Sequence, residues 1–340
     1  MKKKQKINFG IIGVGRIGKI HIENLAHRIP DAQVVAVSDV VESELRKVAE
    51  QYNVVNAFTD YRDVLNFPDI NAIAICSSTD THAQIIQEAA LSGKDIFCEK
   101  PIDLSFKKVI ETLKVVKKSK VKFFLGFNRR FDPNFLKVHE IVHSGRIGKP
   151  HVLTITSRDP APPPLAYLKA SGGIFLDMTI HDFDMARYLI DSEVVEVFAK
   201  GKVLVDSVFK KANDLDTIVV TLTYANGAMA SINNSRQAVY GYDQRVEVLG
   251  SEGMVTVKNN TPDNHIHFNK KGTHSSLPLN FFMERYTQSY LGEMRNFIEC
   301  IQKNKKPSVS GEDGLKAMII AIAAKKSVEE NRPVKTNEIY

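Results

Sequence analysis

The chain has 340 residues, of which 43% are hydrophobic and 25% are charged, and its formal net charge is +7. This composition supplies apolar side chains for about two domains and excludes a largely disordered chain. It also excludes a membrane-spanning helix, because no apolar run approaches the roughly 20 residues that such a helix needs.

The start of the chain and its cysteines indicate a cellular compartment. The basic run at residues 1–6 leads into glycine-rich sequence and lacks the apolar core and cleavage site of a signal peptide. The three cysteines show no CxxC spacing, which favours neither a disulfide framework nor a zinc site. We therefore expect a soluble, unprocessed protein of the cytoplasm.

Residues 7–125 alternate β-branched runs with helical patterns. The predicted strands lie within residues 7–14, 32–40, 71–78, 94–100 and 121–127, and helical patterns cover 19–29, 42–52 and 82–93. Strict alternation of this kind is typical of βαβ units. It predicts a doubly wound parallel sheet, and we assign residues 1–126 to a Rossmann domain.

The first of these strands runs into a G-x-G-x-x-G motif, Gly13-Val14-Gly15-Arg16-Ile17-Gly18. In this strand-to-helix context Gly13 permits the tight turn, Gly15 lets the backbone approach a pyrophosphate, and Gly18 lets the helix pack on the strand. The N-terminus of the helix then offers N–H groups and a positive dipole end to the phosphates. Residues 13–18 are therefore predicted to bind a dinucleotide.

Asp39 ends the second strand, about 20 residues after the motif. At this distance a carboxylate accepts hydrogen bonds from the adenine-ribose diol and repels a 2′-phosphate. Val40, Val41 and Glu42 follow, so no arginine is at hand to hold that phosphate. The cofactor is predicted to be NAD and not NADP.

The fifth strand leads into Glu99-Lys100-Pro101. Ligands of doubly wound sheets bind at the carboxyl ends of the strands, and Pro101 biases Lys100 toward an extended conformation. A lysine at the mouth of a nicotinamide site stabilises an alkoxide or orients a substrate hydroxyl.

The net positive charge favours an acidic partner in principle, but the lysines are scattered. In the lysine-rich stretch 107–122, Val109, Leu113 and Val116 recur at helical spacing, which makes the lysines the solvated face of an amphipathic helix. We expect neither a nucleic acid nor a membrane as partner.

The pattern changes near residue 150. Longer alternating runs lie between 194 and 268, with hairpin turns at Asn226-Gly227 and Glu252-Gly253, and helices are predicted at about 286–303 and 311–330. We predict a substrate-binding and oligomerisation domain of α+β type over residues 127–340, built on a large, mostly antiparallel open sheet. No helix remains to cover one face of that sheet, so we expect a homodimer or homotetramer.

Residues 171–190 read as a buried helix that carries ionisable groups. Asp177 and His181 are four residues apart and would share one helix face. Histidine titrates near neutral pH, so His181 is a candidate general base and Asp177 would hold its tautomer. The glycines at 172–173 would allow close approach of a ligand. Asp182 and Asp184 are interpreted as structural, in a cap or an ion pair such as Asp184 with Arg187.

A metal site is the alternative chemistry. Asp177 and His181 with His265 and His267 could supply ligands, but the latter two lie on a predicted exposed strand or loop. No HExxH motif or carboxylate-rich loop is present, and we expect no metal.

Three motifs together resemble the Gfo/Idh/MocA family of NAD(P)-dependent oxidoreductases, over essentially the whole chain. They are GIIGVGRIGKIH, EKP and GGIFLDMTIHDFDMARY. The resemblance implies a Rossmann domain, a C-terminal α+β domain whose open sheet mediates dimers or tetramers, and a catalytic triad of Lys100, Asp177 and His181. Within the family, residues 156–164 and 171–190 look most like the inositol 2-dehydrogenases.

The subgroup also implies further site residues. Arg130 or Arg129, Asp159, Tyr240 and Tyr286 match positions near the substrate, and the expected cofactor contacts are Gly13, Gly15, Arg16, Ile17, Gly18, Asp39, Ser77 and Lys100. The expected activity is NAD-dependent oxidation of myo-inositol to 2-keto-myo-inositol. Another inositol isomer or a pyranose is the alternative substrate, and a non-catalytic sensor is the alternative function, which the intact triad disfavours. Whether His181 or Lys100 is the base stays open at this point.

Overall fold

The computed structural model describes residues 6–340, so the basic run at the start lies almost wholly outside the described part. The chain forms two compact units: Met1–Phe131 with Gln288–Leu315, and Asp132–Thr287 with Lys316–Tyr340. This differs from the predicted division at residue 126, because a late segment returns to the first unit. The reason is a ring cluster in which Phe297 lies 6.0 Å from Phe9, 6.1 Å from Phe97 and 5.7 Å from Phe124, between ring centroids.

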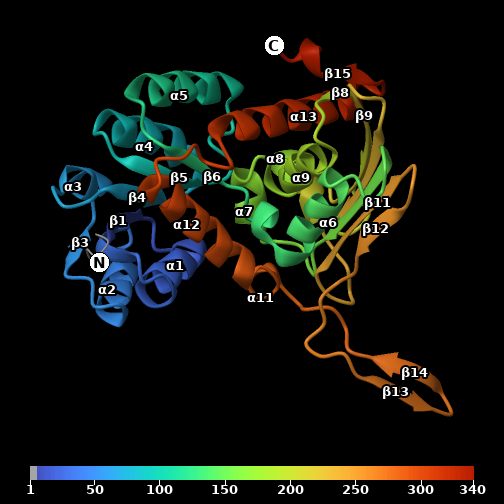
Figure 1. Cartoon of the computed structure of the whole chain (residues 1–340), viewed down its shortest axis with the longest axis horizontal. Coiled ribbons are helices and arrows are strands. Elements are labelled where there is room, and N and C mark those ends of the chain that lie inside the picture. The colour runs from blue at the N-terminus through green and yellow to red at the C-terminus, as the bar shows by residue number, and fades with distance from the viewer. Residues whose placement is uncertain (1–5) are drawn as a thin grey trace. The chain divides into compact units, whose positions relative to one another are not determined.

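The first unit is a doubly wound parallel sheet (Figure 1). Its strands, in the order β3-β2-β1-β4-β5-β6, are β1 Ile7–Ile12, β2 Ala32–Ser38, β3 Asn56–Phe58, β4 Ala72–Ile75, β5 Asp95–Glu99 and β6 Phe123–Gly126. All pairs are parallel, as predicted. Only the short β3 was not expected, since three residues carry too little pattern to be recognised.

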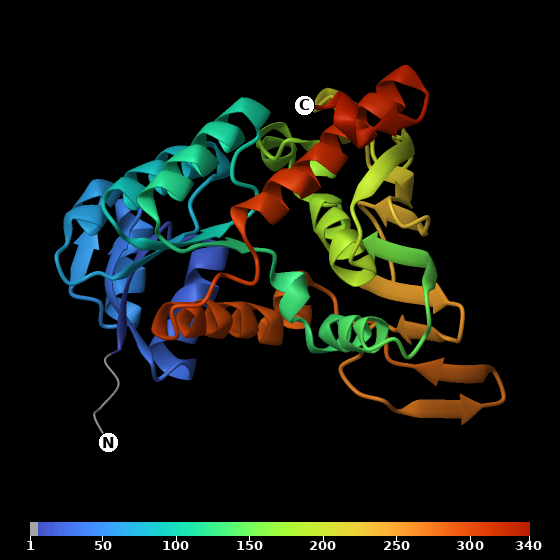
Figure 2. The same cartoon turned by 45° about the horizontal axis from the view of Figure 1, so that its top comes forward.

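Helices cover both faces of this sheet, with α1 on one face and α4 and α5 on the other (Figures 1 and 2). The helices are α1 Arg16–Glu23, continued by the π-helical turn Asn24–Arg28, α2 Glu42–Gln51, α3 Tyr61–Asn66, α4 Thr79–Leu91, α5 Phe106–Ser119 and α12 Thr287–Gln302. In α5 Val109 and Val116 are buried whereas the lysines of the helix are exposed. The amphipathic interpretation of this stretch is confirmed.

The second unit contains the large open sheet. Its strands, in the order β12-β11-β7-β10-β9-β8-β15, are β7 Pro150–Arg158, β8 Val194–Lys202, β9 Thr217–Tyr224, β10 Met229–Ser235, β11 Asp243–Gly250, β12 Met254–Val257 and β15 Val334–Lys335. Only β7 and β10 pair in parallel. The mostly antiparallel sheet and both predicted hairpin turns are confirmed.

One face of this sheet carries helices. The helices of the unit are α6 Pro133–His143, α7 Leu165–Ala170, α8 Gly173–Asp177, α9 Ile180–Ile190, α10 Val208–Lys211, α11 Phe282–Arg285 and most of α13 Gly311–Glu330. Both views place α6 and α9 against the same face of the sheet, where they contact β7, β11 and β12. The strands alternate accordingly, so that Ile218, Val220 and Leu222 of β9 are buried between exposed neighbours.

The opposite face exposes apolar side chains, each more than 40% accessible: Val195, Val219, Met229, Leu249 and Met254. A separate hairpin of β13 Ile266–Asn269 and β14 Gly272–Ser275 projects from the unit (Figure 1). Within residues 6–340, no helix combines the length and the apolar character required to cross a bilayer.

Candidate active site

The glycine motif forms the turn between β1 and α1. A Cβ atom at Gly13, where φ is +92°, would lie 2.5 Å from the backbone nitrogen of Ser77, and one at Gly18 would lie 2.0 Å from the carbonyl oxygen of Gly13. The fold therefore needs glycine at both positions. Around Gly15 there is nothing within 4 Å of such an atom, and no side chain caps the helix that begins next to it. Gly15 leaves open the space that a pyrophosphate needs at a helix N-terminus.

Asp39 is held against this turn. Its Oδ2 accepts a hydrogen bond from the backbone nitrogen of Val14 at 2.8 Å, and its Oδ1 accepts one from Val41 at 2.9 Å. Each oxygen keeps a second lone pair that can accept from a ribose hydroxyl. Val40 and Val41 are exposed beside it, so the surroundings offer no positive side chain from these positions to a 2′-phosphate.

The loops after β4 and β5 are joined by His82, a residue that the motifs did not indicate. Its ring is buried, with Nε2 3.0 Å from the carbonyl oxygen of Ser77 and Nδ1 2.8 Å from that of Pro101. Burial lowers the pKa of His82. Ser77 itself shares a hydrogen bond with Thr81, 2.7 Å between hydroxyl oxygens. Lys100 is half-buried and lies directly after β5, and its peptide bond to Pro101 is cis. His82 therefore connects the loop that carries Lys100 to the loop that carries Ser77.

The prediction of one continuous helix over residues 171–190 is wrong. Asp177 ends α8, and His181 is the second residue of α9. Between them the backbone nitrogens of Met178 and Thr179 both bond the carbonyl of Ile174, at 3.0 and 2.9 Å, which ends the first helix. The hydroxyl of Thr179 lies within hydrogen-bond distance of that carbonyl, at 3.2 Å, and of Oδ1 of Asn234 in β10, at 2.7 Å. Asp177 and His181 are therefore placed by a turn and not by a shared helix face.

Of the paired glycines at the start of α8, Gly173 has a different surrounding from the one expected. Gly172 and Gly173 have φ values of +84° and +81°. A Cβ atom at Gly173 would lie 2.9 Å from Oδ1 of Asp214, which accepts a hydrogen bond from Ile174. The group that lies close to Gly173 is thus the carboxylate of Asp214. Burial raises the pKa of Asp214.

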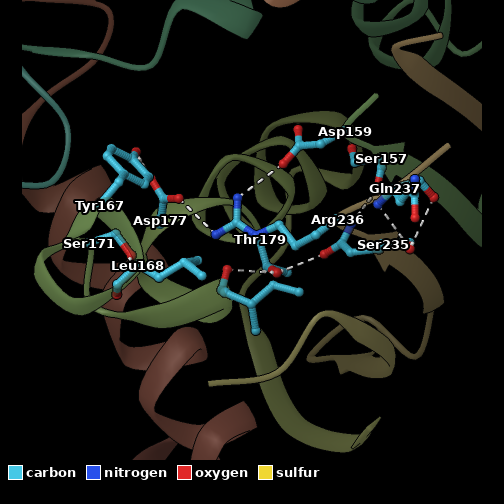
Figure 3. Close-up of polar contacts among 12 residues, drawn as sticks. Ser157, Asp159, Tyr167, Leu168, Ser171, Asp177, Thr179, Ser235, Arg236 and Gln237 are labelled. Atoms are coloured by element: carbon cyan, nitrogen blue, oxygen red, sulfur yellow. Dashed lines mark hydrogen bonds and ion pairs between the residues drawn. The ribbon is translucent and has the colours of Figure 1, made fainter. Parts of the chain in front are cut away.

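Asp177 belongs to a network around the buried Arg236 that sequence motifs did not reveal (Figure 3). Its Oδ1 accepts from the hydroxyl of Tyr167 at 2.7 Å, and its Oδ2 accepts from Arg236 at 2.8 Å. The same guanidinium donates to Oδ2 of Asp159 at 3.0 Å. Burial alone would lower the pKa of Arg236, but the two carboxylates raise it. The pKa of Tyr167 is raised by burial and by Asp177.

Arg236 is therefore the central cation of the network, and it lies only 4% exposed between Asp159 and Asp177. A charge so far from water requires ionic partners. The sequence signal was weak: an arginine directly after β10, in a stretch of polar residues without any motif. Asp159 keeps partial exposure, 23% of its side chain, and can also contact a ligand.

Asp182 and Asp184, which were interpreted as structural, are both buried. Asp182 is fully buried and accepts from Ser157 at 2.6 Å and from Asn234 at 2.8 Å, so it anchors α9 to the sheet. Asp184 is also buried, so it does not lie at the surface, where the suggested pair with Arg187 was expected. The guanidinium of Arg187 donates to Glu193 at 3.0 Å.

The other residues matched to substrate contacts differ in accessibility. Tyr240 is partly exposed, accepts from Arg158 at 2.8 Å and donates to Asp243 at 2.6 Å. Tyr286 is only 2% exposed and its hydroxyl donates to Gln244 at 3.2 Å. Tyr286 would need to move before its hydroxyl could reach a ligand.

Arg129 and Arg130 form a 3₁₀ turn after β6 in the first unit, and both are buried. Arg130 donates to Asp313 at 2.9 Å. Burial by itself raises the pKa of Asp313, but Arg130 and Ser310 lower it to about 2. This arginine thus joins α13 to the end of β6.

The histidines considered as metal ligands lie apart from this site within the second unit. His265 is exposed and contacts Asp263, and His267 is exposed on β13. Among residues 6–340, one group alone, His21, Glu99 and Glu293, brings several possible ligand atoms together.

Comparisons with known proteins match both units of the chain. Residues 7–127 match the model of an oxidoreductase family with an NAD-binding Rossmann fold, and residues 135–256 match the GFO/IDH/MocA C-terminal domain. The chain is 51% identical over 333 residues to the myo-inositol 2-dehydrogenase of Thermotoga maritima, covering 98% of this chain and 99% of the relative. It is 46% identical to the inositol 2-dehydrogenase of Rhizobium meliloti, covering 96% and 98%.

A solved structure shares this fold: scyllo-inositol dehydrogenase from Lactobacillus casei with bound NAD(H) and scyllo-inositol. It has a TM-score of 0.90 and 32% identity, covering 98% of this chain and all of the other. The glycine turn with Asp39 and the family models agree on a nicotinamide dinucleotide as cofactor. The chain therefore belongs to the Gfo/Idh/MocA family of oxidoreductases, with an NAD-binding Rossmann domain followed by the C-terminal domain of that family.

Proposed function

We propose that this protein is an NAD-dependent inositol 2-dehydrogenase that oxidises myo-inositol to 2-keto-myo-inositol. The observation that carries the proposal is the combination of an open glycine turn beside Asp39 with near full-length similarity to a myo-inositol 2-dehydrogenase. Relatives named for scyllo-inositol are less similar, at 32–33% identity. We therefore favour the myo isomer over the alternatives of another inositol or a pyranose.

Residues of the first unit fit the cofactor. The open space at Gly15 receives the pyrophosphate, with Arg16, Ile17 and Gly18 at the start of α1, and Asp39 accepts from the adenine ribose. Ser77 and Lys100, at the carboxyl ends of neighbouring strands, lie on the edge of the sheet where nicotinamide binds. Bound NAD supplies the hydride acceptor, at C4 of its nicotinamide ring.

The chain's own residues handle the proton and the charge. His181 takes the proton of the substrate hydroxyl as the carbinol carbon loses its hydride and the C–O bond becomes a carbonyl. Lys100 donates a hydrogen bond to the same oxygen and stabilises its developing negative charge. Asp177, held by Tyr167 and Arg236, supplies a fixed negative charge that favours the imidazolium form of His181.

Polyol recognition requires hydrogen-bond acceptors and donors at the same surface. We assign Asp159 and Tyr240 to this role, because both keep partial exposure while their orientation is set by Arg236 and Arg158. Arg130 and Tyr286 remain candidates only if their buried side chains move on binding.

We further propose a cytoplasmic homotetramer, or at least a homodimer. The outward face of the large sheet exposes Val219 and Met229 by 45% and 54%, and the projecting hairpin exposes Ile266 and Phe268 by 57% and 71%. Apolar surface of this extent is normally covered by a second copy of the chain.

The direct test is NAD reduction with a panel of inositols and pyranoses, followed at the nicotinamide absorbance. We expect the highest kcat/KM with myo-inositol. A higher value with scyllo-inositol, chiro-inositol or a pyranose would replace the assigned substrate, and no reduction with any polyol would refute the activity.

A further inference from the structure

Behind the loop that carries Lys100, the first unit buries a cluster of ionisable side chains that the proposed mechanism does not use. His21 of α1 lies with Nε2 2.7 Å from Oε1 of Glu99, at the end of β5, and 3.9 Å from Oε1 of Glu293 in α12. The side chains of His21 and Glu293 are 0% exposed and that of Glu99 is 15% exposed. Three segments far apart in sequence thus converge on one imidazole nitrogen.

The surroundings of this cluster are apolar. The ring of His21 packs edge-on against Phe97 at 4.8 Å and against Tyr290 at 5.8 Å, between ring centroids. Within the described residues, neither carboxyl oxygen of Glu293 has a hydrogen-bond partner. An ionised carboxylate in such a site, close to a second one, would cost several kcal/mol.

Burial first and the charge of Glu99 second raise the pKa of Glu293 well above its ordinary value. Glu293 also raises the pKa of the Cys76 thiol, after burial and the charge of Glu99. Oε1 of Glu99 accepts the hydrogen on Nε2 of His21 at 2.7 Å, so the imidazole holds this carboxyl group in place.

A metal ion is the competing explanation, because these three residues could supply ligands. However, ligand atoms around a tetrahedral ion at about 2.0–2.2 Å lie about 3.4 Å apart, whereas His21 and Glu99 are 2.7 Å apart, at hydrogen-bond distance. The geometry favours a shared proton.

Glu99 is rigidly placed by the sheet as well. It pairs in register with Gly126 of β6, and a Cβ atom at Gly126 would lie 3.2 Å from Oε2 of Glu99. Successive residues of a strand point to opposite faces, so anchoring the Glu99 side chain beneath the sheet fixes the direction in which the next residue leaves it.

We propose that His21 is a positioning residue for Lys100, acting through its hydrogen bond to Glu99 in a buried cluster that Glu293 completes. The proposal rests on the proposed role of Lys100. Loss of the His21 donor releases Glu99, and a displacement of about 1 Å at Lys100 costs roughly 10²-fold in rate.

The test is a series at His21 in the full-length enzyme. His21→Gln keeps an N–H group with similar reach, His21→Asn shortens that reach, and His21→Leu removes the donor. We expect kcat to fall by roughly 10²-fold in the Asn and Leu variants and to recover mostly in the Gln variant. Val109→Ala, a buried change on α5, is the control for general loosening of the unit.

A second measurement does not depend on the substrate. The rate at which acetic anhydride labels Lys100, relative to exposed Lys118, is measured by peptide mass spectrometry in each variant. A severalfold change in Asn and Leu, absent in Gln and in the Val109→Ala control, supports the proposal even if inositol proves not to be the substrate. Equal labelling and kcat across the series overturns it, and comparing Asn with Gln suffices if His21→Leu does not fold. A stoichiometric metal in the purified protein, lost in Glu293→Gln, also overturns it.

Discussion

Replacing Glu293 by glutamine tests the protonation of the buried cluster through stability alone. At pH values somewhat above 4.5, the ordinary pKa of glutamate, Glu293 keeps its proton in the folded state, whereas the unfolded chain releases it. The native state then binds more protons than the unfolded state, so wild-type stability falls as pH rises from about 4.5 toward the raised pKa. Linkage sets the slope at up to about 1.4 kcal/mol per pH unit. Glutamine has no ionisable proton, so the variant lacks this pH-dependent contribution to the free energy of unfolding.

Between pH 5 and pH 7, Glu293→Gln should therefore gain up to about 3 kcal/mol relative to wild type. At about 2 °C per kcal/mol for a large chain, this corresponds to a growth of about 5 °C in the difference between the two melting temperatures. The assay is calorimetry of both proteins at several pH values and constant ionic strength. The same comparison in the His21→Gln background provides the matched control, because that background lacks the imidazole of the cluster. A difference in melting temperature that stays constant from pH 5 to pH 7 would refute a protonated Glu293.

Further predictions concern the cofactor, the base, the buried arginine and the assembly. NAD should exceed NADP in kcat/KM by at least ~10-fold because Asp39 repels a 2′-phosphate; comparable values would contradict this. His181→Ala should lower kcat by roughly 10²–10⁴ while NAD affinity stays unchanged, and a folded variant with normal turnover would remove His181 from the mechanism. Arg236→Met should cost about 3–5 kcal/mol of stability, measured by denaturant unfolding, because two carboxylates lose their shared cation; a cost below about 1 kcal/mol would mean that water replaces it. Light scattering should show a dimer or tetramer, and Phe268→Asp should weaken the assembly; a concentration-independent monomer would disprove it.

Much of the fold follows from local sequence pattern. Alternating β-branched runs and helical spacing predict the parallel sheet of the first unit, and period-2 runs with glycine turns predict the sheet of the second. The glycine turn can also be predicted from local sequence. Gly13 and Gly18 satisfy backbone requirements within a few residues of each other, and Asp39 closes the turn from the next strand.

Other features were decided only by tertiary structure. The network around Arg236 joins residues 59 apart in sequence, and the hydrogen bond between His21 and Glu99 joins residues 78 apart. In the turn after Asp177, the hydroxyl of Thr179 donates to Asn234, 55 residues further along the chain. Likewise α12 returns to the first unit because Phe297 completes its aromatic core. Local propensity and periodicity act over a few residues, whereas partners for buried charges and rings are supplied by whichever distant segments the topology brings together.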